Sequence, residues 1–159
     1  MSAEPRSGTV VGIYVAAAAG AGTAPLDEAR LEAGRGIAGD RYHAGSGTFS
    51  PKEMDPDHQV TLIALEEVEA FNAASGQSLG PGAFRRNVVT RGVDLNALIG
   101  RRFRVGEAEL RGTRLCEPCA HLAGLLNGEV LKRMVHRAGL RAEIVKGGVV
   151  RPGDAVEVG

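Results

Sequence analysis

The stretch RAEIVKGGVVRPGDAVEV, residues 141–158, decides the fold class. It contains three short strand-like runs, at 141–145, 148–151 and 155–158, which are separated by a Gly-Gly pair and a Pro-Gly-Asp turn. Short runs rich in β-branched residues and bounded by Gly and Pro are typical of strands joined by tight connections. This end of the chain therefore predicts β structure.

The rest of the chain continues the pattern. Similar strand-like runs lie at 9–17, 59–65, 87–91, 101–105 and 107–113. Only two helical regions are predicted: a short one at 66–74, with Gly76 just past its end, and a longer one at 118–138, stopped by Gly139. Residues 44–58 are rich in Gly, Ser, Pro and Asp and predict one long loop. Many short strands and few helices predict a mainly β fold, a closed or nearly closed β-barrel with a few short helices.

Length and composition predict one ordinary globular domain. The 159 residues are 43% hydrophobic and 24% charged, which suits a single domain over residues 1–159 with its core at about 9–158. No apolar run reaches the length of a membrane-spanning helix, and the two cysteines do not make a disulfide framework. We therefore expect a cytoplasmic protein that does not enter a membrane.

The charged residues favour a small anionic ligand over a nucleic acid. Nineteen Lys and Arg balance nineteen Asp and Glu, and Trp is absent, so neither charge nor stacking surface indicates a nucleic-acid partner. Sixteen of the nineteen cations are Arg. Arg binds carboxylate and phosphate in two-point geometry, which Lys cannot do, so this bias favours a bound anionic small molecule. The base composition of the genome explains the bias equally well.

The sharpest chemical signal is RLCEPCAH, from Arg114 to His121. Pro118 suits the first turn of a helix, which would place Cys119 beside a helix N-terminus. Free backbone N–H groups and the positive end of the helix dipole favour a thiolate there, and Arg114 and His121 could add to the effect. A thiolate suits a nucleophile, a sulfur carrier or a soft-metal ligand. The alternative is that the cysteines are small buried hydrophobes, and for Cys116 that interpretation is favoured.

Two other uses of the cysteine pair can be compared with this one. A structural zinc site needs four ligands, and the sequence offers neither a second Cys pair nor a closely spaced His pair, so no zinc is expected. A dithiol redox protein using Cys116 and Cys119 remains an alternative, because Cys-x-Pro-Cys at a helix start is typical of such sites. That motif usually follows an early strand in a βαβ unit, whereas here it comes late in a β-rich chain.

A second candidate segment, Phe84 to Asn96, carries Arg85, Arg86 and Arg91 together with Asn87. These side chains offer forked donors for phosphate or for the polar edge of a pterin. Strand alternation would put Arg85, Asn87 and Arg91 on one side and Arg86 on the other. The alternative is that they are rim charges on a surface strand.

The third segment is Gly-punctuated and contains Asp40 and Arg41. Asp40 either orients Arg41 or His43 or fills a turn position, and its spacing favours the turn.

Four motifs in this order resemble the MOSC domain, the module named after the C-terminal part of molybdenum cofactor sulfurases. Gly-Ile-Ala-Gly-Asp-Arg-Tyr-His at 36–43 is similar to the family's Gly-Ile-x-Gly-Asp-Arg element, and 84–92 is similar to its Arg-x-Asn-[Ile/Val] segment. Residues 115–119 lie where the family carries its signature Cys, and 147–154 resemble its last hairpin. The resemblance covers nearly the whole chain.

The resemblance implies a β-barrel that works on the molybdenum–pterin cofactor. It assigns the signature Cys to Cys119, as sulfur carrier or molybdenum ligand, and puts Arg85 and Asn87 at cofactor-contacting positions; Asp40 and Arg41 match a motif only. Relatives include sulfurases and reductases, so a cysteine desulfurase or a molybdoenzyme is an implied partner.

The resemblance does not extend to pyridoxal phosphate. Family sulfurases bind that cofactor in a separate domain, for which 159 residues leave no room, so we do not expect it here. A non-catalytic cofactor carrier stays open beside a catalyst.

Overall fold

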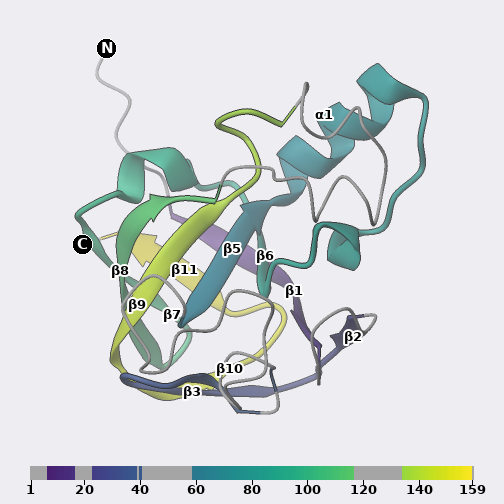
Figure 1. Cartoon of the computed structure of the whole chain (residues 1–159). Helices are drawn as coiled ribbons and strands as arrows, with labels where there is room; N and C mark the ends of the chain where they lie inside the picture. Colours follow the sequence, from purple (N-terminus) through teal and green to yellow (C-terminus); the bar gives the residue numbers. More distant parts are fainter. Residues whose placement is uncertain (1–6, 17–22, 39, 41–58, 117–133, 159) are drawn as a thin grey trace.

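The computed structural model describes residues 7–16, 23–38, 40, 59–116 and 134–158. Within these ranges the chain forms a closed barrel of seven strands, because the first and last strands of the row also pair with each other (Figure 1). In order around the barrel they are β1 (Gly8–Val15), β6 (Val88–Arg91), β5 (Val60–Ala64), β9 (Leu140–Lys146), β8 (Ala108–Leu115), β7 (Arg102–Val105) and β11 (Ala155–Val158). The predicted mainly β barrel is confirmed, and every strand-like run of the sequence overlaps an observed strand.

One pair of neighbouring strands explains the position of the helix. β5 and β6 are parallel, whereas the other barrel pairs are antiparallel. A parallel pair needs a crossover, which here contains α1 (Leu65–Ser75) and the short 3-10 helix η2 (Pro81–Phe84). Helix α1 ends at Gly76, whose left-handed φ of 74° suits a C-terminal stop. The predicted short helix is thus confirmed.

Two apolar clusters follow from the alternation of side chains along the strands. Val60 and Leu62 of β5 point into the barrel, whereas Ile63 points outward and packs with α1. In the outer cluster the rings of Phe71 and Phe84 meet edge to face, with centroids 5.3 Å apart. The inner face of each strand therefore fills the barrel, and the outer face of β5 and β6 is partly covered.

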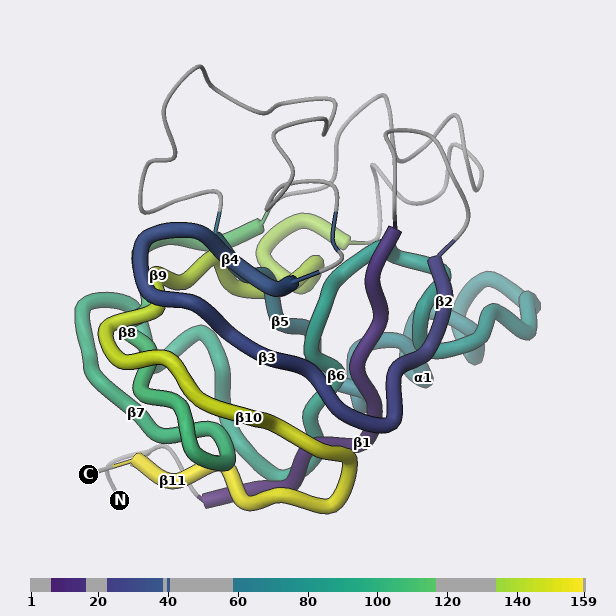
Figure 2. The backbone as a smooth tube through the Cα atoms, turned by 90° about the horizontal axis from the view of Figure 1, so that it is seen from below, coloured from purple at the N-terminus to yellow at the C-terminus, as the bar shows by residue number. Residues whose placement is uncertain are grey.

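A small second sheet closes one end of the barrel. It consists of β10 (Gly148–Val150), β3 (Ala29–Glu32) and β4 (Gly36–Ile37), and Figure 2 shows β3 and β10 crossing the barrel opening. Their apolar side chains, including Leu31 and Val150, belong to the barrel core. Strands β3 and β4, the two-residue β2 (Ala24–Pro25) and the 3-10 helix η3 (Leu95–Leu98) were not expected from the sequence.

The described part of the expected long helix is not helical. Residues 135–137 form a turn, and His136 has a left-handed φ of 62°, which a continuous α-helix does not permit. The prediction of helix there was wrong because apolar spacing alone does not reveal such a backbone reversal. Residues 118–133, and the expected loop at 44–58, lie outside the described residues. None of the described helices is long and apolar enough to span a bilayer.

Candidate functional site

The candidate site lies on the outer face of three neighbouring strands, β8, β9 and β5. Arg114 on β8 is the Cα partner of Arg141 on β9, and Arg141 is in turn the partner of Thr61 on β5. Residues 140, 142 and 144 fill the core, so Arg141 points outward, and directly opposite residues on one face have Cβ atoms about 4.5–5.5 Å apart. We call Arg114, Arg141 and Thr61 the arginine row.

The charges of the arginine row differ from those of the row beside it. In that neighbouring row, Arg111 of β8 faces Glu143 of β9, with 2.7 Å between Arg111 Nε and Glu143 Oε1. In the arginine row two arginines are Cα partners on one face instead, an arrangement of like charges that is unfavourable unless anionic groups lie close by. Arg114 and Arg141 each also make a further polar interaction. Because a guanidinium has five N–H donors, each can hold an additional anionic oxygen.

A β-bulge shapes this end of β8. The register with β9 shifts between Gly112 and Arg114, so Thr113 is the extra residue, and its hydroxyl donates to the Arg141 carbonyl oxygen at 3.0 Å. Gly112 is required because a Cβ atom there would collide with the carbonyl of Leu98. The bulge thus rotates β8 locally and brings Arg114, rather than Thr113, opposite Arg141.

Asn87 is buried beside this row and links neighbouring strands by hydrogen bonds. Its side chain is 4% exposed, and its Oδ1 accepts hydrogen bonds from the backbone N–H and from the hydroxyl of Thr61, both at 3.1 Å. Its Nδ2 donates to the carbonyl of Tyr14 at 3.1 Å. Asn87 therefore joins β1 to β5 at the start of β6, and both lone pairs of its amide oxygen are already used.

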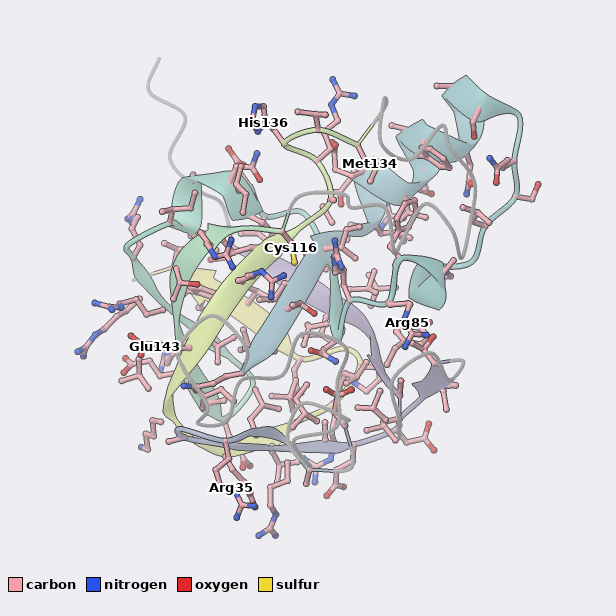
Figure 3. The ribbon with its side chains drawn as sticks, viewed as in Figure 1. Arg35, Arg85, Cys116, Met134, His136 and Glu143 are labelled. Atoms are coloured by element: carbon pink, nitrogen blue, oxygen red, sulfur yellow. The ribbon has the colours of Figure 1, made fainter. Side chains whose placement is uncertain are left out.

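The three arginines of the segment from Phe84 to Asn96 are placed apart. Arg85 has a left-handed φ of 62° and lies beside η2, well separated from Cys116 (Figure 3). Arg86 donates from Nε to the Ala138 carbonyl oxygen at 2.7 Å. Arg91, at the far end of β6, pairs with a carboxylate of α1 in solvent.

The expected alternation within this segment was wrong. The regular strand starts only at Val88, so alternation does not apply to Arg85 and Arg86. Arg86 and Asn87 both contact the β5–β9 side of the barrel, through Ala138 and Thr61.

Of the other expected site residues, the structure describes Asp40 and Cys116. Asp40 is 1% exposed, and its Oδ1 accepts the backbone N–H of Ala16 at 3.1 Å, so it ties the end of β1 to the segment after β4. Cys116 is a free thiol, 1% exposed, and its backbone N–H donates to the Gly139 carbonyl at 2.8 Å. Arg41, Cys119 and His121 lie outside the described residues. Among the described residues no three His, Cys, Asp or Glu side chains are grouped to hold a metal.

Sequence reasoning missed Arg141, Thr61 and Thr113. Alternation along 141–145 could have placed Arg141 on the outer face, since its neighbours at 140, 142 and 144 are apolar or small. The pairing with Arg114 could not have been found in this way, because it depends on the register of β8 against β9 and on the bulge.

Comparisons with known proteins agree with this architecture. A family model for the MOSC domain matches residues 39–157. The fold is similar to the crystal structure of the YuaD protein from Bacillus subtilis, with a TM-score of 0.81 and 20% identity over 98% of this chain and 97% of that chain. It is also similar to YiiM from Geobacillus stearothermophilus, with a TM-score of 0.74 and 16% identity over 96% and 75% of the two chains. For YiiM from Escherichia coli the TM-score is 0.69 and the identity 20%, over 98% and 70% of the chains. No curated protein matches the sequence.

Proposed function

The chain belongs to the MOSC domain family, and on this premise we propose that it binds an anionic molybdenum–pterin cofactor on the outer face of β5, β8 and β9. Cys119 is then the reactive thiolate, either taking the outer sulfur from a donor persulfide, whose thiolate leaves, or ligating molybdenum. The observation that carries the proposal is the facing pair Arg114 and Arg141, which concentrates positive charge at one point of the barrel surface.

The donor set of this face suits the anionic part of such a cofactor. Arg114 and Arg141, each with forked N–H donors, are opposite each other on one strand pair. The hydroxyls of Thr61 and Thr113 already donate to Asn87 and to the Arg141 carbonyl, so they hold these strands in place and leave the arginines as the donors for the cofactor. Arginine binds phosphate in two-point geometry, which fixes orientation as well as charge. These residues fit the phosphate end of a pterin cofactor, and a single thiolate fits a soft metal whose remaining ligands come from the cofactor itself.

The chain's own residues would bind and orient, and the bound molybdenum centre would supply the redox or sulfur-transfer chemistry. Arg114 and Arg141 hold the anionic group and set its distance from the end of β8. Asn87 does not need to touch the cofactor, since its amide oxygen is already used to fix β5 against β6. The protein thus acts as catalyst or carrier, with a cysteine desulfurase or a molybdoenzyme as partner.

The test is metal and pterin analysis of protein purified from a host that makes the cofactor. Arg141→Gln is expected to lower cofactor affinity by about 10- to 100-fold, the value of a hydrogen bond to a charged group. Arg111→Gln is the matched control, because Arg111 is the next outward arginine of β8 but is neutralised by Glu143. Cys119→Ser should lose molybdenum.

The outcomes separate the parts of the proposal. Equal loss of cofactor in the Arg141 and Arg111 variants would show that only net charge matters and would remove the arginine row from the site. Absence of molybdenum and pterin from the wild-type protein would refute tight cofactor binding, and a persulfide on Cys119 would then be sought by mass spectrometry.

A further inference from the structure

A hydrogen bond from Arg86 holds the base of the segment that connects β8 to β9. That segment begins at Cys116 and ends at Gly139, and we call Cys116, Ala138 and Gly139 its base. The backbone N–H of Cys116 donates to the Gly139 carbonyl at 2.8 Å and so closes the base. Arg86 comes from the start of β6, and its Nε donates to the adjacent carbonyl, that of Ala138, at 2.7 Å. Two neighbouring carbonyls are therefore held by donors from two different parts of the chain.

The backbone at Gly139 fits tightly against β5. Gly139 has a φ of 118°, and a Cβ atom at this position would collide with the Leu62 carbonyl and come within 3.6 Å of Arg86 Cγ. The Arg86 stem thus lies along the glycine backbone. No other partner of Arg86 is found in the described ranges, so Ala138 is its defined contact.

The base and the arginine row are adjacent in sequence on both strands. Arg114 lies two residues before Cys116, and Arg141 lies two residues after Gly139. The base thus directly continues strands β8 and β9, which are paired up to Leu115 and Leu140, so the contacts at the base act on the strand ends that carry both arginines.

We propose that Arg86 is a positioning residue: its Nε–H bond to Ala138 holds the base closed and keeps Arg114 and Arg141 opposite each other. The closure of the base follows from the contacts alone, and only its effect on cofactor binding rests on the proposed function. Arg86 was expected from the sequence to bind the cofactor directly, and the two roles lead to different experimental results.

Two variants separate the hydrogen bond from the charge. Arg86→Gln keeps an N–H donor on the atom bonded to Cδ and removes the charge, whereas Arg86→Met removes both. The readout is amide hydrogen exchange of Cys116 by NMR, with the amide of Val10 as the control, since it donates to Asp154 elsewhere in the barrel at 2.8 Å. For Arg86→Met we expect Cys116 exchange to accelerate about 10- to 100-fold with Val10 unchanged, and for Arg86→Gln to stay near wild type.

Three results would overturn the proposal: unchanged Cys116 exchange in Arg86→Met, equal acceleration in both variants, or equal acceleration of the Cys116 and Val10 amides. Binding of inorganic pyrophosphate provides the second readout. Loss of pyrophosphate affinity to the same extent in both variants, with Cys116 protected, would make Arg86 a direct ligand instead. If wild-type protein does not bind pyrophosphate, the proposed anion site fails, whereas the exchange result still decides whether Arg86 positions the base.

Discussion

Replacing Asn87 by alanine is expected to lower the free energy of unfolding of the cofactor-free protein by about 2–4 kcal/mol. The substitution removes the acceptor of the Thr61 N–H and the donor to the Tyr14 carbonyl, two backbone groups that lie beside a side chain only 4% exposed. An unsatisfied buried group costs about 1–3 kcal/mol, and two would cost about 2–6 kcal/mol. Water that enters the space left by the amide would satisfy part of this need, which favours the lower half of the range.

Urea unfolding followed by circular dichroism measures this quantity directly. The control is Asn96→Ala, because Asn96 Nδ2 also donates to a carbonyl, that of His136 at 2.8 Å, but at an exposed position. Its effect should stay within about 0.5 kcal/mol. Combining Asn87→Ala with Thr61→Val should give less than the sum of the two single effects, because both remove the hydrogen bond from the Thr61 hydroxyl to Asn87 Oδ1.

One result would refute this reasoning. If the free energy of unfolding of Asn87→Ala is within about 0.5 kcal/mol of the wild-type value but the variant purifies with less cofactor, Asn87 contacts the cofactor, as the family resemblance implied, and does not act by linking the strands. A large loss of stability with an unchanged m-value would instead assign its role to the barrel itself.

Three other substitutions test separate features of the molecule. Thr90→Val should leave stability unchanged or raise it by up to about 1 kcal/mol in a urea titration, because the fully buried Thr90 hydroxyl has no hydrogen-bond partner among the described residues; a clear destabilisation would reveal a partner. Gly139→Ala should cost about 2–4 kcal/mol by the same method, since φ is 118° and the new methyl group would collide with the Leu62 carbonyl; a neutral result would mean that the base can shift. Cys116→Ser should keep the cofactor content of wild type, because the thiol is only 1% exposed; loss of thiol–disulfide exchange activity in this variant would favour the dithiol alternative.

The barrel was predictable because its signal is local. Short β-branched runs, several of them bounded by turns such as Pro152-Gly153, recur along the chain, and each predicted run overlaps a strand. Strand β3 was missed because Ala29–Glu32 is only four residues long, so its alternation of apolar and charged residues is too short to stand out from the polar sequence around it. It is a strand because Leu31 and Ala29 are buried against the barrel core, which is a tertiary effect.

The candidate site was less predictable than the fold. The sequence drew attention to Arg85, Arg86 and Arg91 because they are neighbours along the chain, yet the structure places them at three different locations. Arg114 and Arg141 are 27 positions apart and meet only through the register of β8 and β9. Periodicity describes one strand at a time, so a site shared between strands is not visible in it.

The closure of the barrel by β1 and β11 has a consequence for how the molecule can be rearranged. Gly8 is the Cα partner of Val156, so the first and last strands leave the barrel at the same place, and Ser7 and Val158 line one shared surface hollow. A short linker could join these two ends without disturbing a single strand pairing, and new ends could be opened at an exposed turn such as the one around Gly34, where nothing lies within 4 Å of an added Cβ atom. The fold then depends on which strands are neighbours in the barrel and not on the order of the strands in the sequence. A circularly permuted chain should therefore form the same barrel surface.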